Sequence, residues 1–157
     1  MIKYIPEDTS VTFVEIPDEI CLCINLSNCP HRCPGCHSEY LQRDIGKELT
    51  EEVLDSLIHK NDGITCVVFM GGDSDKVTLM NLAKYITINY NVLIGWYSGE
   101  SELDLNNFGR YFNYIKVGPY IKSKGPLNVQ TTNQRLYYNE VKNNEVISKD
   151  ITHQFWR

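Results

Sequence analysis

The sequence lacks several features that mark common classes of protein. No apolar run approaches the roughly 18 residues that a membrane span requires, and no segment repeats or has low complexity. Basic residues are in deficit, because 15 lysines and arginines stand against 20 acidic residues, which gives a formal net charge of −5. Nucleic-acid-binding proteins normally carry a basic face. We therefore expect neither a nucleic acid nor a membrane as a partner.

The N-terminal segment also lacks the apolar stretch of a signal peptide, and acidic residues follow at Glu7 and Asp8. We therefore expect a cytoplasmic protein. In that compartment the six cysteines would bind metal or stay reduced rather than form disulfides. A length of 157 residues predicts a single domain, residues 1–157, with its own hydrophobic core.

Three of the six cysteines lie within eight positions, in the segment Cys29-Pro-His-Arg-Cys33-Pro-Gly-Cys36. A structural zinc site needs four protein ligands, and an ordinary 4Fe–4S cluster takes four cysteines. Three thiolates would leave one iron of such a cluster open to a small molecule. The alternative is a zinc ion with His31 or His37 as the fourth ligand. We favour the cluster, because zinc sites usually pair two close ligand couples and no second couple exists here.

The other three cysteines lie in apolar segments. Cys66 belongs to the run 64–70 and is most simply a small buried hydrophobe. Cys21 and Cys23 would point to the same face of an expected strand. They would form a redox pair, supply an extra ligand, or line the core with thiols. Free cysteine is among the most buried residue types, which favours the core.

The apolar pattern alternates between strands and helices. Strands are expected over 11–16, 20–26, 64–70, 92–97 and 114–117, and helices over 50–61 and 79–86, with weak helical character over 101–112. This order predicts an α/β fold with a parallel sheet. A complete eight-fold barrel needs about 250 residues, so we expect an open, partial β/α barrel. The segment 135–147, with Asn143-Asn144 at its middle, predicts a C-terminal hairpin.

The cysteine loop resembles the cluster-binding motif of the radical S-adenosylmethionine (SAM) enzymes. Most of those enzymes carry an aromatic residue before the last cysteine, where this chain has Gly35. The run CPHRCPGCH is similar to the loops of the activating proteins of anaerobic ribonucleoside-triphosphate reductase, which read CxxxCPGC. The resemblance extends over nearly the whole chain and implies a partial, open barrel of radical SAM type.

For the metal, the resemblance implies one 4Fe–4S cluster per chain, held by Cys29, Cys33 and Cys36. SAM would bind at the open iron, and the main chain at Gly35, Cys36 and His37 would pass beside its adenine. His31 would face solvent or lie behind the cysteine ligands.

The resemblance also implies contacts to the methionine end of SAM. Gly71-Gly72-Asp73 follows a strand at the place where radical SAM enzymes have Gly-Gly-Glu near the SAM amino group. Taken alone, these residues would be a tight turn and a helix cap. Ser98 stands where the related activators have Thr-Gly. It would bond the methionine carboxylate or a ribose hydroxyl, or else cap the following helix.

Residues 114–120 and 131–135 resemble stretches of the same activating proteins. The aromatic C-terminal segment, 152–157, would pack over the sheet or form part of a docking surface.

The activity implied by the resemblance is that of a radical SAM oxidoreductase. An external donor such as reduced flavodoxin would reduce the cluster, and SAM would be cleaved to methionine and a 5′-deoxyadenosyl radical. That radical would take hydrogen from a glycine-bearing loop of anaerobic ribonucleoside-triphosphate reductase. The alternatives are activation of another glycyl-radical enzyme, a small-molecule radical SAM reaction, and a non-catalytic zinc-binding interaction module.

Overall fold

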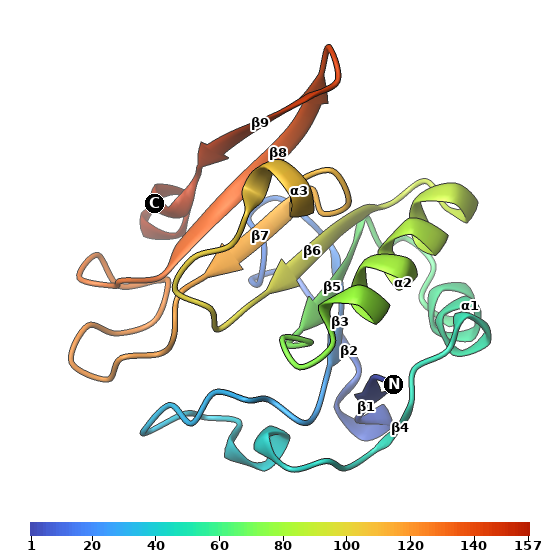
Figure 1. The fold of residues 1–157 in the computed structure, drawn as a ribbon, viewed down its shortest axis with the longest axis horizontal. Coiled ribbons are helices and arrows are strands. Elements are labelled where there is room, and N and C mark those ends of the chain that lie inside the picture. The colour runs from blue at the N-terminus through green and yellow to red at the C-terminus, as the bar shows by residue number, and fades with distance from the viewer.

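The computed structural model describes all 157 residues, and its main feature is one open sheet of seven strands (Figure 1). In spatial order these are β2 (Ser10–Thr12), β3 (Cys21–Asn25), β5 (Cys66–Met70), β6 (Leu93–Tyr97), β7 (Tyr114–Val117), β8 (Arg135–Lys142) and β9 (Glu145–Asp150). The short strands β1 (Lys3–Tyr4) and β4 (Lys47–Glu48) pair separately with each other. The strand expected over 11–16 ends at Thr12, and the other expected strands are present.

The expected open, partial β/α barrel of radical SAM type is wrong. Only β3, β5, β6 and β7 run parallel to one another, and antiparallel strands flank them at both edges. The segment 118–134 between β7 and β8 forms turns without a helix, so the chain returns directly as an antiparallel strand. The sheet therefore stays open and mixed, because the chain adds no further β/α unit after β7.

The C-terminal hairpin is present, with β8 and β9 paired from Tyr137 opposite Asp150 to Lys142 opposite Glu145. Its turn residues Asn143 and Asn144 have φ angles of 52° and 63°. A two-residue turn of this kind needs positive φ at both positions, and asparagine tolerates that conformation better than most residues.

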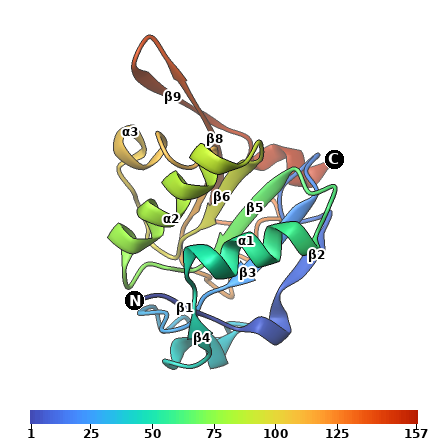
Figure 2. The same ribbon diagram turned by 90° about the vertical axis from the view of Figure 1, so that its right-hand side faces the viewer.

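The helices lie on one face of the sheet, where α1 (Glu51–Lys60) and α2 (Lys76–Asn89) cross the central strands (Figure 2). The Oγ1 atom of Thr50 accepts the Val53 amide at 3.2 Å and begins α1 as the sequence predicts. The third helix, α3 (Leu105–Phe108), is a single turn. None of the helices has the length and apolar character needed to cross a lipid bilayer.

Successive side chains of the central strands point to opposite faces of the sheet, which produces two core layers. Side chains such as Phe69 and Trp96 pack beneath the helices in the larger layer. On the opposite face Cys21, Cys23 and Cys66 pack with other apolar side chains in the smaller layer. Further along this second face, toward the carboxyl ends of the parallel strands, the packing opens into cavities. Ligands commonly bind in the crevice at that edge of an α/β sheet.

Candidate functional site

The cysteine loop leaves β3 and is fixed to the chain segment that comes after it. The amides of Asn28 and Cys29 donate to the carbonyls of Arg43 and Leu41, both at 2.9 Å. The amide of Cys36 donates to the Cys33 carbonyl at 3.2 Å and closes a tight turn. Backbone hydrogen bonds therefore hold both ends of the cysteine loop.

The three loop cysteines, Cys29, Cys33 and Cys36, line one small cavity of about 190 Å³. All three are half-buried free thiols. Burial raises the pKa of the Cys29 thiol. The Ser38 amide donates to the Cys36 sulfur at 3.4 Å. Three thiols with no fourth cysteine on the cavity wall fit a cluster that keeps one iron free of protein ligands.

The other cysteines belong to the core. Cys21 and Cys66 have no exposed surface, and Cys23 is 5% exposed. Burial raises the pKa of Cys23 to about 12, and the hydrogen bond that the Cys66 thiol donates to Cys21, together with burial, raises the pKa of Cys66. Their place in the core is confirmed, and none of the three lines the small cavity.

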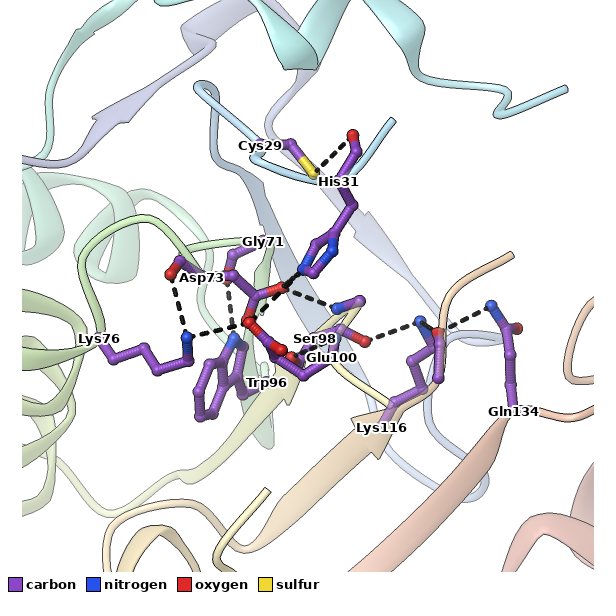
Figure 3. A network of polar contacts seen from close by, with 12 residues as sticks. Cys29, His31, Gly71, Asp73, Lys76, Trp96, Ser98, Glu100, Lys116 and Gln134 are labelled. Carbon is purple, nitrogen blue, oxygen red and sulfur yellow. Dashed lines mark hydrogen bonds and ion pairs between the residues drawn. The ribbon is translucent and has the colours of Figure 1, made fainter. Parts of the chain in front are cut away.

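Asp73 is the buried acidic group of the site, with a side chain only 2% exposed (Figure 3). Its Oδ1 atom accepts the Ser98 hydroxyl at 2.6 Å. Its Oδ2 atom accepts the Gly99 amide at 2.8 Å and lies 2.8 Å from His31 Nε2. A carboxylate can only accept hydrogen bonds, so this nitrogen of His31 carries the proton. Asp73 and the three cysteines share the wall of the small cavity.

Gly71 and Gly72 form the turn that carries Asp73 out of β5. Their φ angles are 115° and 101°, which side chains rarely adopt. A Cβ atom on Gly72 would lie 2.9 Å from Leu79 Cδ2, which leaves no room for a larger residue without movement. Gly71 lies on the wall of the small cavity, whereas Gly72 faces the core beside Leu26 and Leu79.

Ser98 comes directly after β6 and is completely buried. Its hydroxyl donates to Asp73 and accepts the Glu100 amide at 3.0 Å. It does not cap a helix, because the next helix, α3, begins only at Leu105. Ser98 thus contacts Asp73 directly and holds the carboxylate in place.

The remaining expected residues lie around the last loop cysteine. The His37 ring lies 6.0 Å from the Tyr120 ring, measured between centroids. Gly35 has a φ of 77° and lies beside Tyr120 and Lys122. His31, in contrast, turns inward onto Asp73 and away from open solvent, with 22% of its side chain exposed.

A larger cavity of about 850 Å³ adjoins the small one on the same sheet face. Val14, Glu15, Leu127 and Phe155 line the larger cavity and not the small one. The C-terminal segment therefore lies over this face of the sheet, which is one of the two expectations for that segment. The residues that border both cavities are Cys36, Ser38, Met70, Tyr97, Lys116, Tyr120 and Gln134. The two cavities are therefore direct neighbours with a shared wall.

Sequence reasoning assigned no role to Met70, Tyr97, Lys116 and Tyr120. One signal was available: Lys116 interrupts the apolar strand Tyr114–Val117, where a charged side chain is unusual. Met70 and Tyr97 look like ordinary core residues in the sequence, whereas Tyr120 ends the stretch 114–120 that resembles the activating proteins. The pairing of the strands brings all three to the site.

Comparison with known proteins agrees with the chemistry of the thiols. A model of the family described as 4Fe-4S single cluster domain matches residues 20–146, which include the cysteine loop, all three α-helices and the strands from β3 to β8. Searches of curated proteins and of solved structures returned no match. Because the family model covers well over half of the chain, the protein belongs to the 4Fe-4S single cluster domain family.

Proposed function

We propose that the protein is a radical SAM activating enzyme that generates a glycyl radical on anaerobic ribonucleoside-triphosphate reductase. One observation carries the proposal. Three thiols of a single loop share a small cavity with a buried carboxylate, and that cavity shares much of its wall with a larger one. An electron carrier needs only to enclose its cluster. A second cavity beside the thiols would give room for another molecule next to the metal, which supports the proposal.

In this proposal Cys29, Cys33 and Cys36 hold the 4Fe–4S cluster. Bound there and reduced by an external donor, the cluster would supply the one electron needed to cleave SAM into methionine and a 5′-deoxyadenosyl radical. The chain itself binds and orients the reactants and keeps water from the site.

Asp73 is the residue that would receive the SAM ammonium group. A carboxylate has about four acceptor positions, and three are taken by Ser98, Gly99 and His31. One acceptor position on Oδ1 remains. Because the three existing bonds fix the carboxylate, it would meet the ammonium group without a loss of side-chain freedom.

The larger cavity would take the adenosine part of SAM and the glycine loop of the reductase. Cys36 and His37 line it near the cluster, and Tyr120 packs against the His37 ring. Flat aromatic rings suit a purine base. Val14 lines this cavity and is 75% exposed, and Phe13 next to it in the chain is 70% exposed, so the two would offer apolar surface to a protein partner.

The test uses protein reconstituted with iron and sulfide without oxygen and then reduced with dithionite. We expect an electron paramagnetic resonance signal that SAM changes, together with formation of 5′-deoxyadenosine. A cluster signal that SAM leaves unchanged, without formation of 5′-deoxyadenosine, would mean that the protein is an electron carrier and not a radical SAM enzyme. A colourless protein with one tightly bound zinc ion would mean that the chain is a non-catalytic zinc-binding interaction module.

A further inference from the structure

Lys116 is a buried cation at the junction of the two cavities. It lies in β7 with 8% of its surface exposed, on the same sheet face as Tyr114. Its Nζ atom donates to the carbonyls of Ser98 and Gly118, both at 2.9 Å (Figure 3). These two bonds hold the ammonium group beside the residue that fixes Asp73.

The ammonium group has no ion-pair partner in the protein. An ammonium has three N–H donors, and only two are used. None of the ion pairs within 4.0 Å involves Lys116 Nζ, which lies over the Tyr97 ring at 5.8 Å from its centroid. Burial lowers the pKa of Lys116 to about 8, while the negative charges of Asp73 and the loop cysteines act in the opposite direction. The side chain is therefore mostly charged at neutral pH.

Burying a cation without an opposite charge costs free energy, and the Tyr97 ring at 5.8 Å offsets only a small part of that cost. An anion in the cavity is therefore expected to offset the rest. Lys116 and the three loop cysteines line the same small cavity. A cluster held by three thiolates carries net negative charge, and reduction adds one more negative charge. A nearby positive charge in a poorly solvated site stabilises the reduced state more than the oxidised state.

We propose that Lys116 supplies a fixed positive charge that makes the cluster easier to reduce. One electron passes from the external donor to the cluster, and Lys116 neither gains nor loses a proton. The inference rests on the placement of the cluster in the proposed function, but it does not depend on SAM. Net charge near the metal is one of the means by which proteins set the potential of iron–sulfur clusters.

The test is a redox titration of the reconstituted full-length protein without SAM, monitored by the signal of the reduced cluster. For Lys116→Met and Lys116→Gln, we expect the ratio of reduced to oxidised cluster at a fixed potential to fall about tenfold. For a one-electron couple this is a midpoint about 59 mV more negative. Lys116→Arg, which keeps the charge, is expected to stay close to wild type.

Two comparisons keep the result interpretable. Lys142 is a strand lysine with a side chain 63% exposed and lies outside both cavities, so Lys142→Met should leave the midpoint unchanged. Gln at position 116 keeps a hydrogen-bond donor for the two carbonyls. A wild-type midpoint in Lys116→Gln would overturn the proposal. Any shift of the midpoint in Lys116→Met would then come from movement of the loops that carry the two carbonyls and not from loss of the charge. If the midpoint shifts in Lys116→Met and Lys116→Gln while SAM has no effect on the cluster signal of the wild type, this inference stands and the proposed function is wrong.

Discussion

At the scale of single residues, the cysteines fall into a loop set and a core set. Cys33→Ala removes a half-buried loop thiol. We expect iron and sulfide contents to fall to background, while the free energy of unfolding of the metal-free protein changes by less than about 0.5 kcal/mol. Chemical assay of iron and sulfide, with denaturant unfolding under anaerobic conditions, measures both.

The matched control is Cys66→Ala, which removes a completely buried sulfur. It should keep the cluster and lose about 1 kcal/mol of stability through the cavity that it leaves. Normal iron content in Cys33→Ala, or loss of the cluster in Cys66→Ala, would contradict the assignment of the ligands.

Asp73 provides a second test at this scale. Asp73→Asn removes the negative charge and leaves fewer acceptors for Ser98, Gly99 and His31. We expect SAM affinity to fall at least tenfold and stability to fall by about 1–3 kcal/mol. Equilibrium binding of SAM to the reconstituted protein and denaturant unfolding measure the two effects.

Asp75 offers the comparison for Asp73. Its carboxylate accepts the Thr78 amide at 3.1 Å and caps α2, and asparagine caps helices about as well as aspartate. Asp75→Asn should therefore keep SAM binding. An equal loss of SAM affinity in both variants would show that the negative charge near the start of α2, and not the Asp73 carboxylate in particular, governs SAM binding.

The buried charge of Lys116 predicts a pH dependence of stability. Its folded-state pKa of about 8 lies below its ordinary value of 10.5. Between these values the unfolded chain binds a proton that the folded chain does not, so this contribution raises stability as pH increases. The wild type should gain about 3 kcal/mol relative to Lys116→Met between pH 7 and pH 10.5.

Denaturant unfolding of both metal-free proteins across that range measures the gain. The buried cysteines and tyrosines titrate in both proteins, so the difference isolates the lysine. A difference between the two proteins that does not change with pH would mean that Lys116 is not a desolvated cation in the folded state.

At the scale of the elements, the hairpin turn makes a separate prediction. Asn144 has a φ of 63°, and its carbonyl accepts from Arg110 Nη2 at 2.8 Å. Asn144→Val places a β-branched residue in a left-handed conformation and should cost about 1–2 kcal/mol. Asn144→Gly should cost nothing or stabilise slightly. Thermal unfolding measures both, and equal stabilities would mean that the turn is not of this type.

Local patterns predicted most of the elements. The Thr50 cap, the apolar runs of β5 and β6 and the paired asparagines are short-range signals, and each appears where the sequence places it. Strand β2 ends at Thr12, because Phe13 and Val14 turn outward and are mostly exposed. The partial barrel was a wrong prediction because a barrel needs further parallel β/α units after β7. The chain instead continues into β8, which pairs antiparallel with β7, and the alternation of strands and helices before β7 does not predict this.

At the scale of the whole molecule, the predictable part of the site is the part that is contiguous in sequence. The cysteine loop and Gly71–Asp73 each stand out as short motifs. Lys116, Tyr120 and Gln134 reach the same cavities through the parallel pairing of β6 with β7 and the antiparallel pairing of β7 with β8. The sequence marks them only as members of two stretches, 114–120 and 131–135, that resemble the activating proteins, and it does not predict that they lie beside the cysteine loop.

The most direct test of the proposed enzyme traces hydrogen from the reductase into SAM-derived product. Reduced, reconstituted protein is mixed with SAM and an anaerobic ribonucleoside-triphosphate reductase labelled with α-deuterated glycine. The 5′-deoxyadenosine formed is then examined by mass spectrometry. The proposed activation predicts one deuterium in the product and a protein-based radical on the reductase. Deoxyadenosine that contains no deuterium, with no radical on the reductase, would contradict it.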